Sequence, residues 1–588
     1  MTDINKLITD NFDIWSGAIK RKSVTGRGSN KKIDLLGVKK LRELILELAV
    51  IGKLTTQKSA DEPATRLLEK IKIKRESLVK SKLIKKPKKF SEITDAEKYC
   101  ELPLGWEFAR LNDLGEWGSG STPKRGVSEY YGGSIPWFKS GELNGNYISE
   151  SEETLTELAL QNTSLRLNKV GDVLIAMYGA TIGKTSILSV EATTNQAVCA
   201  CTPFDGFSNR YLLTLLKAFR PKFIGMGAGG AQPNISRDKI IATVIALPPE
   251  EEQTRIVEKV EELMALCDQL EQQTEASIDA HQLLVEELLS TLTNSDNAKE
   301  FEQNWARIAE HFDLLFTTEH SIEQLKQTIL QLAVMGKLVP QDPNDEPASK
   351  LLERIAQEKE QLIKGKVIKK QKSLADIAEE EKPFEVPQGW EWARVGDLLS
   401  LKNGYAFKSK YFIEKTSEFI LTTPGNFYEE GGFRHRGEKT KYYEGPIDPE
   451  YIFDSGDLII PMTEQAAGLL GSAAFIPKDQ SKYLHNQRLG KLTPYSNLTT
   501  LEFIYLFFNS SFLREELART CTGMKVRHTS PDRILKVLIP VMPPREQVRI
   551  TAKVDELLRI CEQLKHHLVS AKSTQVQLAE SVVEQALS

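Results

Sequence analysis

The strongest constraint on the fold is a heptad-patterned segment that occurs twice, each time after a Pro-Pro pair. The first copy runs from about 247 to 292 and begins LPPEEEQTRIVEKVEELMALCDQLEQQ, and the second begins MPPREQVRITAKVDELLRICEQL. Apolar residues recur at alternating steps of four and three in both copies: Ile256, Val260, Leu263, Cys267 and Leu270, then Ile550, Val554, Leu557, Cys561 and Leu564. Such a seam needs a partner helix. We expect the two copies to pair with each other as an antiparallel coiled coil; the alternative is an ordinary amphipathic surface helix used twice.

A second set of motifs is also duplicated and precedes each heptad segment. DLLGVKKLRELILELAVIGKL at 34–54 is an amphipathic helix that ends near a glycine, and it returns as LKQTILQLAVMGKL at 325–338. The match continues through DEPA at 61–64 and 345–348 and through GWE at 105–107 and 389–391. We expect the apolar stripe, which includes Leu44 and Leu48 and, in the second copy, Leu332, to be buried.

Basic residues are concentrated after the first amphipathic helix. Residues 70–89 contain ten Lys or Arg against the single acid Glu76, and the second copy keeps Lys359, Lys364, Lys366, Lys369, Lys370 and Lys372. A charge run of this kind is usually a solvated helix face. A face turned toward phosphate or toward a protein partner remains the alternative.

Short apolar alternations and Gly-rich turns replace the helical period at 102–249 and again at 386–542, which predicts two mixed α/β domains. Landmarks recur in order, such as GDVLI and GDLII at 171–175 and 456–460 and Asn-Gln at 195–196 and 486–487, but the sequence between them differs. The predicted class is α+β: two such domains separated by paired long antiparallel helices, with a pseudo-two-fold internal duplication. The divisions are an N-terminal extension at 1–33, helical frames at 34–101 and 303–385, globular domains at 102–249 and 386–542, long helices at 250–292 and 543–588, and a linker at 293–302.

Composition narrows the class of protein. The net charge is −4, so the basic balance typical of a nucleic-acid binder is absent, and the two globular domains are each close to neutral, with 13 Lys or Arg against 14 Asp or Glu at 102–250 and 19 against 19 at 385–541. No apolar run is long enough to cross a membrane, and the N-terminus lacks a secretory pattern. Six scattered cysteines indicate free thiols in a reducing cytoplasm. We expect a cytoplasmic protein.

The sequence offers no complete catalytic or metal site. Tyr178–Thr185, YGATIGKT, resembles a phosphate-binding loop but has three residues between its glycines where that motif needs four. Cys199 and Cys201 lack a second pair of ligands. His485 is expected to have a structural role in its loop. We find no nucleophile elbow, no dinucleotide fingerprint and no amino-methyltransferase box, so we expect no catalytic residues and no metal ligands.

Taken together and in order, these paired motifs resemble the specificity subunits of type I restriction–modification systems, over the chain from about residue 34. The resemblance implies that each globular domain is a target recognition domain that reads one half of a split, asymmetric DNA sequence, while the long helices set the separation of the halves. It also implies one copy per complex, with double-stranded DNA, two modification (methyltransferase) subunits and two restriction (translocase and nuclease) subunits as partners. S-adenosylmethionine would belong to the modification subunits, and ATP and Mg to the restriction subunits.

Cationic and aromatic residues inside the divergent inserts are the candidate DNA contacts, each weighed against an ordinary solvated surface residue. In the first domain they are Lys124, Arg125, Lys139, Tyr178 and Lys184. In the second domain they are Lys408, Lys410, Arg434, Arg436, Lys439, Lys441, Arg488, Lys525 and Arg527. Two other functions remain open: a non-catalytic coiled-coil adaptor that presents two protein-binding domains, and a stand-alone enzyme, against which the missing catalytic motifs argue.

Overall fold

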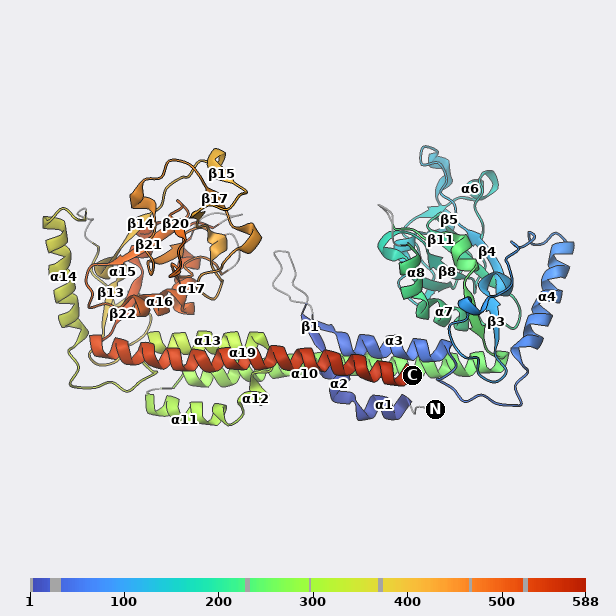
Figure 1. The fold of residues 1–588 in the computed structure, drawn as a ribbon, viewed down its shortest axis with the longest axis horizontal. Helices are drawn as coiled ribbons and strands as arrows, with labels where there is room; N and C mark the ends of the chain where they lie inside the picture. The colour runs from blue at the N-terminus through green and yellow to red at the C-terminus, as the bar shows by residue number, and fades with distance from the viewer. Residues whose placement is uncertain are drawn as a thin grey trace. The chain divides into compact units, whose positions relative to one another are not determined.

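The computed structural model describes residues 4–21, 33–227, 233–295, 298–368, 374–464, 468–521 and 527–587. The chain divides into two units (Figure 1): unit 1 contains residues 1–276 and 571–588, and unit 2 contains residues 277–570. Each unit is built from helices of the frame and one mixed globular domain. In the described ranges no helix is both long enough and apolar enough to cross a membrane.

Within the predicted N-terminal extension at 1–33, unit 1 begins with two short helices, and residues 22–32 lie outside the described residues. The frame elements are α1 (Ile4–Asp10), α2 (Phe12–Gly17), β1 (Ile19–Arg21), β2 (Ile33–Leu35), α3 (Leu36–Val50) and α4 (Ala64–Lys80). Strands β1 and β2 pair antiparallel. The stripe of α3 is buried as predicted, because Leu44 and Leu48 are almost completely shielded from solvent.

The globular domain of unit 1 is organised around one five-stranded sheet with the order β4-β11-β8-β9-β6. Helix α7 covers this sheet and also contacts α3, so the frame and the domain share a core. Two smaller sheets, β10-β5-β7 and β12-β3, complete the domain. Its strands are β3 (Glu107–Arg110), β4 (Gly115–Ser119), β5 (Tyr131–Phe138), β6 (Tyr147–Ile148), β7 (Thr154–Leu155), β8 (Val173–Ala176), β9 (Thr185–Leu188), β10 (Thr193–Thr194), β11 (Val198–Pro203) and β12 (Val244–Leu247). Its helices are α5 (Leu111–Leu114), α6 (Glu157–Asn162), α7 (Asn209–Ala218), α8 (Arg220–Gly227) and α9 (Arg237–Ile241).

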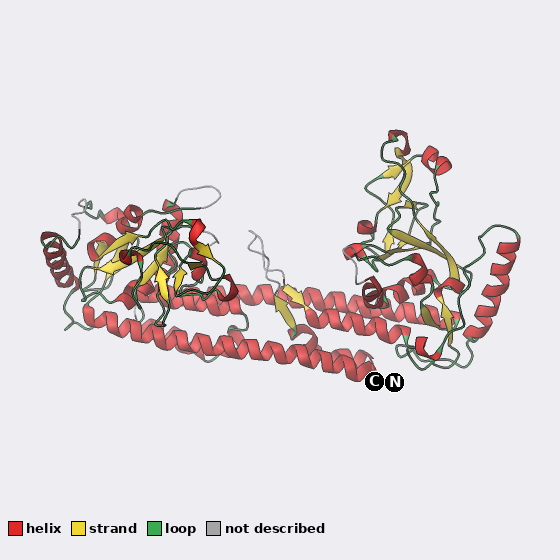
Figure 2. Ribbon diagram, turned by 45° about the horizontal axis from the view of Figure 1, so that its top comes forward, coloured by secondary structure: helices red, strands yellow, loops and turns green. Residues whose placement is uncertain are grey.

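Unit 2 repeats this plan with a different insert. Its main sheet, β14-β21-β18-β19, corresponds to β4-β11-β8-β9, and β13-β22 corresponds to β3-β12, but a four-stranded sheet, β15-β17-β16-β20, replaces β10-β5-β7. Figure 2 shows strands concentrated in the globular domains and helices in the frame. The helices are α11 (Ala298–Ala309), α12 (Phe312–Leu315), α13 (Glu319–Val334), α14 (Ala348–Lys364), α15 (Val395–Leu398), α16 (Leu501–Asn509), α17 (Ser511–Thr520) and α18 (Pro531–Lys536). The strands are β13 (Glu391–Arg394), β14 (Leu399–Asn403), β15 (Phe412–Ile413), β16 (Phe419–Leu421), β17 (Tyr442–Tyr443), β18 (Leu458–Pro461), β19 (Ala474–Phe475), β20 (Lys482–Leu484), β21 (Leu489–Pro494) and β22 (Leu538–Val541).

Two helices of 44 residues, α10 (Glu250–Thr293) and α19 (Pro544–Leu587), contain residues of both units. Helix α10 begins in unit 1 and ends in unit 2, and α19 runs in the opposite sense. This confirms the predicted class of two mixed domains joined by long antiparallel helices. The predicted linker at 293–302 is shorter than expected, because α11 begins at Ala298 and buries Phe301.

The heptad seams lie in different units, and each is covered inside its own unit. Ile256, Val260, Leu263, Cys267 and Leu270 are buried, as are Ile550, Val554, Leu557 and Cys561, while Leu564 is partly buried. In unit 2 the seam of α19 belongs to one hydrophobic core with Ile329 and Leu332 of α13. In unit 1, Arg42 of α3 donates to Asp268 (2.6 Å) and Glu271 (2.8 Å) of α10. The seams therefore have frame helices as partners within their units, which differs from the expected pairing of one seam with the other. A heptad pattern predicts a buried stripe but does not specify which apolar helix covers it.

The burial of the frame stripe leads to a stability prediction in unit 2. Leu332 is fully buried in the core beside α19, whereas Leu314 of α12 is 70% exposed. We expect Leu332→Ala to lower the free energy of unfolding of unit 2 by about 2–4 kcal/mol, because it removes buried methyl groups and leaves a cavity. Leu314→Ala should change it by less than about 0.5 kcal/mol. Urea denaturation followed by tryptophan fluorescence measures both; equal effects of the two variants would show that the stripe is not a packed core.

Candidate nucleic-acid interface

A buried carboxylate joins the first globular domain to its long helix. Glu252, in the first turn of α10, is completely buried and accepts a hydrogen bond from Trp106 Nε1 at 2.9 Å. Thr55 Oγ1 and Gln57 Nε2 donate to its other oxygen at 3.0 and 2.9 Å. Three donors offset the cost of removing this polar group from water. The indole of the GWE motif, the segment after α3 and the start of α10 are thus held at one point.

The same arrangement, a buried glutamate that ties the opening of the globular domain to the first turn of a long helix, recurs in unit 2; we call it the buried joint. Glu546 accepts from Trp390 Nε1 at 3.0 Å and from Gln341 Nε2 at 3.2 Å. Burial raises the pKa of the Glu546 carboxyl, although the Trp390 and Gln341 donors oppose that shift. The repeated amphipathic helix ends in a Gly-Lys turn, here called the GK turn, and its glycine is required on steric grounds. Gly336 has φ +70°, and a Cβ on it would lie 2.5 Å from Pro387 and 2.8 Å from the ring of Trp390.

The glutamine that follows each buried glutamate anchors a domain helix. Gln253 accepts from the Ser208 backbone N–H at 2.8 Å, and Ser208 is the N-cap of α7. Gln547 accepts from the Thr500 N–H at 3.2 Å, and Thr500 is the N-cap of α16. Gln253 and Gln547 are completely buried. The Glu-Gln pair of the Pro-Pro motif is therefore a structural connector, a role that the sequence pattern alone did not reveal.

The remaining paired motifs complete the joint. Asp61 of DEPA pairs with Arg255 of α10, which lowers the pKa of the Asp61 carboxyl, and Asp345 pairs with Arg549 of α19 at 2.7 Å. The lysine of each GK turn caps a long helix at its far end. Lys53 Nζ donates to the Leu587 carbonyl (2.6 Å) within unit 1, and Lys337 Nζ donates to the Thr293 carbonyl (2.9 Å) within unit 2. A cation at a helix C-terminus satisfies free carbonyls and opposes the helix dipole.

In the first domain, two predicted DNA contacts converge on one acid. Arg125 donates to Glu153 at 2.5 and 3.2 Å, and Lys139 lies 2.6 Å from the same carboxylate, which lowers the pKa of Glu153 to about 2. The Arg125 guanidinium also lies over the rings of Tyr131 and Trp137. These cations form a fixed cluster on the β5 sheet rather than two independent free charges.

The other candidates of the first domain are less constrained. Tyr178 is exposed, Lys124 is exposed, and Lys184 donates to Asn144 Oδ1 at 2.7 Å. Tyr178–Thr185 connects β8 to β9, which pair antiparallel. A phosphate-binding loop leads from a strand into a helix, so this hairpin connection supplies no such site.

In the second domain, the candidates surround the sheet that replaces β10-β5-β7. Lys410 lies over the ring of Tyr411 at 4.8 Å, and Arg434 lies over Tyr428 at 4.5 Å. Arg436 lines a groove of about 420 Å³. Lys408, Lys439, Lys441 and Arg488 are exposed, Arg527 lies 3.5 Å from Glu464, and Lys525 lies outside the described residues. Cations beside aromatic rings suit contacts to phosphates and bases.

Both domains expose a glutamine that the sequence offers only as a landmark. Gln196 and Gln487 occupy corresponding turns and are exposed, and the Thr122 hydroxyl donates to Gln196. Glutamine can recognise adenine through two hydrogen bonds. Their exposure, which a sequence does not reveal, is the signal that distinguishes them. His485 beside the second turn is buried, its Nε2 lies 3.0 Å from the Leu489 carbonyl, and burial lowers its pKa to about 4, which fits the structural role predicted for it.

The described part of the chain contains no group of three or more His, Cys, Asp or Glu side chains able to hold a metal ion. All six cysteines are free thiols. The notable features of each domain are therefore a divergent, cation-bearing insert and a buried joint to the frame.

Comparison with known proteins assigns the family. The model of the type I restriction modification DNA specificity domain matches residues 103–280 and 387–570. The EcoAI specificity subunit of Escherichia coli is 40% identical over 99% of this chain and 100% of its own length. The EcoEI specificity subunit, also from Escherichia coli, is 36% identical over the same shares. The chain belongs to the family of type I restriction enzyme specificity subunits. A solved HsdS subunit from Thermoanaerobacter tengcongensis aligns with a TM-score of 0.39 and 18% identity, over 84% of this chain and 99% of that one.

The buried joint predicts a pH-dependent effect of removing one donor. Trp390→Phe keeps an aromatic ring but removes the N–H that stabilises the ionised Glu546 carboxylate, so we expect a loss of about 1–3 kcal/mol in unfolding free energy at pH 7. The pKa of Glu546 is already raised, so the loss should shrink as the pH falls toward that pKa and the carboxyl takes up a proton. Trp392→Phe, which removes only a 3.3 Å bond to the Phe384 carbonyl, is the control. Urea titrations at several pH values measure both; a loss in Trp390→Phe that does not vary with pH would contradict the assigned role.

Proposed function

We propose that this chain is the DNA sequence-recognition subunit of a type I restriction–modification complex. It would read a bipartite, asymmetric target, with one recognition domain for each half. The observation that carries the proposal is a pair of domains whose frames and joints share the same Glu-Trp and Glu-Gln contacts while their inserts differ in strand number and composition. Two family-model matches to a DNA specificity domain cover these same regions.

The energetics of recognition suit this arrangement. A good base-specific contact contributes about 1–3 kcal/mol of discrimination against the wrong base. When two recognition domains lie on one chain, the discrimination free energies of their two half-sites add. The insert of each domain can change its cations and rings without disturbing the buried joint, because the Glu-Trp pair lies outside the inserts. The near-neutral charge of both domains means that partner subunits would neutralise part of the DNA phosphate.

The proposed partners follow from the family. Two modification subunits would supply S-adenosylmethionine and the methyltransferase chemistry, and two restriction subunits would supply ATP- and Mg-dependent translocation and cleavage, around one copy of this chain. The duplicated frame offers two equivalent docking places, which supports a pair of modification subunits. The chain itself would contribute recognition and scaffolding and no catalytic residue.

Titration of labelled duplex, with and without co-expressed modification subunits, tests the proposal against its alternatives. A specificity subunit binds one duplex sequence selectively when the modification subunits are present. A coiled-coil adaptor with two protein-binding domains binds no duplex in either case. A stand-alone enzyme turns over without partners.

Modularity gives a sharper prediction. Replacing 102–249 with the corresponding domain of the EcoAI relative should change one half of the methylated sequence and leave the other half intact, because each reader contacts only its own half-site. Replacement of 386–542 is the reciprocal control and should change the opposite half. Methylation sequencing of cells that express each chimaera with the modification subunits measures the outcome. If either replacement altered both halves together, the two domains would not be independent readers.

A further inference from the structure

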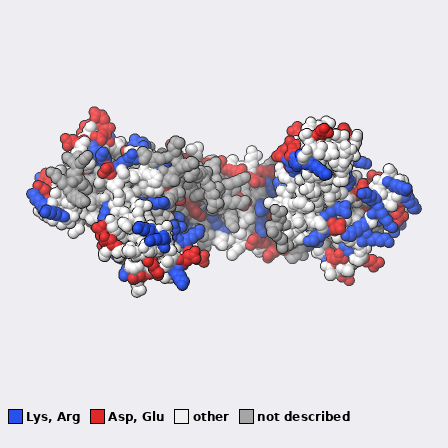
Figure 3. Space-filling view, turned by 90° about the horizontal axis from the view of Figure 1, so that it is seen from above, with Lys and Arg blue, Asp and Glu red and all other residues white. Residues whose placement is uncertain are grey.

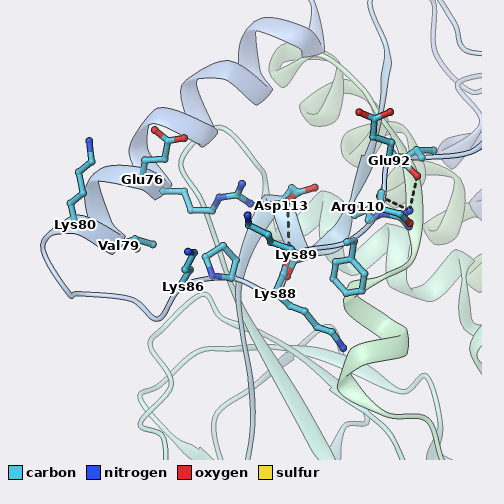
Figure 4. A pocket seen from close by; sticks show the side chains of 15 residues that line it. Glu76, Val79, Lys80, Lys86, Lys88, Lys89, Glu92, Arg110 and Asp113 are labelled. Atoms are coloured by element: carbon cyan, nitrogen blue, oxygen red, sulfur yellow. Dashed lines mark hydrogen bonds and ion pairs between the residues drawn. The ribbon is translucent and has the colours of Figure 1, made fainter.

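A basic groove lies outside the recognition inserts of unit 1, between α4 and the segment that follows it. Its volume is about 600 Å³. Figure 4 shows Glu76 and Lys80 on α4 at one side, Lys86, Lys88 and Lys89 on the facing segment, and Arg110 at the other end. The groove is thus lined mainly by the basic stretch whose role the sequence left open.

The lining cations fall into two groups. Arg75 donates to Asp113 (2.8 Å), Lys88 to Asp238 (2.7 Å) and Arg110 to Glu97 (2.8 Å). These hydrogen bonds attach the basic segment to the recognition domain. Lys80, Lys86 and Lys89 are exposed, and the described residues give none of them an ion-pair partner. One group therefore builds the groove, and the other presents three free ammonium groups to a ligand.

The turn that forms the groove carries backbone strain. Lys82 has φ +59°, and Lys366, its counterpart in unit 2, has φ +57°; among the described residues these are the two non-glycine positions with positive φ. Glycine would adopt this conformation more easily after a helix. Because both copies keep this conformation, it is a shared feature of the turn and does not distinguish the first groove from the second copy. Lys82 and Lys85 add two further exposed cations beside the groove.

We infer that this groove binds the phosphates of double-stranded DNA that flank the half-site read by the first recognition domain. The inference rests on the proposed function. The recognition domain is nearly neutral, whereas residues 70–89 hold ten Lys or Arg against one acid, so the phosphate-binding charge of unit 1 is concentrated here. Figure 3 shows Lys and Arg side chains gathered at the end of unit 1 that carries α4. Lysine ammonium groups on flexible stems suit a contact that carries no sequence information.

The second copy carries less net positive charge, and two of its described cations are engaged, so we expect its phosphate contact to be weaker. Residues 354–373 hold seven Lys or Arg and two Glu. Lys359, the counterpart of Arg75, donates to the Gly396 carbonyl at 2.7 Å and lies over the ring of Tyr495. Lys364 is paired with Glu360 at 3.1 Å. Flanking DNA should therefore contribute more on the side of the first domain than on the side of the second.

The test uses the complex with its modification subunits and the target found by methylation mapping. Three duplexes are compared: one trimmed to the target, one extended by about one helical turn on the first-domain side, and one extended equally on the other side. The variant is Lys80→Gln/Lys86→Gln/Lys89→Gln. The control, Lys364→Gln/Lys366→Gln/Lys370→Gln, removes the same charge from the second copy, where Lys364 and Lys370 are the sequence counterparts of Lys80 and Lys86.

We expect the groove variant to bind the duplex extended on the first-domain side roughly ten-fold or more weakly than the wild type does. The slope of the logarithm of its binding constant against the logarithm of the salt concentration should become shallower by about 0.9 for each phosphate that the groove no longer neutralises. Binding to the trimmed duplex and the methylated sequence should stay unchanged, as should all binding by the control variant.

An equal weakening on all three duplexes, or no weakening on any, overturns the inference. Failure of the complex to assemble would instead assign the groove, with exposed Leu83 beside it, to a protein partner and would overturn the inference as well. Failure of the wild-type complex to bind the trimmed duplex would contradict the proposed function itself.

Discussion

The hydrogen bond between a buried carboxylate and a tryptophan N–H is the interaction on which each half of this protein depends. Glu252 with Trp106, and Glu546 with Trp390, connect the opening of a recognition domain to the first turn of a long helix. The adjacent glutamine holds the N-cap of a domain helix from the same turn. Because these polar groups are buried, breaking one bond leaves an unsatisfied group and costs more than an exposed bond would. The domain cannot change its orientation on the long helix without that loss.

The joint also explains why the duplicated motifs are short and widely separated in sequence. GK, DEPA, GWE and the Glu-Gln that follows Pro-Pro each contribute one or two hydrogen bonds or ion pairs to the same frame. Asp61 fixes the segment before α4 to Arg255, and Lys53 caps the long helix that returns from the other half of the chain. Function is then free to vary elsewhere: the inserts can exchange one cation or ring for another while the frame stays constant.

Much of the fold follows from the sequence, because the heptad seam and the α3 stripe specify buried faces through their spacing. The partner of each seam did not follow, since Ile256 and Ile550 need an apolar neighbour that several helices could supply. The candidate site was harder to predict. Charge alone points to Arg125 and Lys139, yet the structure pairs both with Glu153, which is distant in sequence and which only folding brings near. Gln196 does not stand out in the sequence, because exposure, the property that makes it a candidate, depends on the turn in which it lies.

The central claim is that rigid joints fix each reader to a long helix, so that helix length sets the separation of the half-sites. Insertion of four residues in both helices, after Gln272 in α10 and after His566 in α19, tests it most directly. The insertion adds roughly 6 Å and a net rotation of about 40°, close to the rotation of about 34° for one base pair of B-DNA. Rotation should dominate, because a reader that faces away from its groove makes no base contact, while small length errors can be absorbed by DNA deformation. Methylation mapping should then show both half-sites unchanged and the unread gap longer by about one base pair. An active complex that methylates with the original gap would contradict the account.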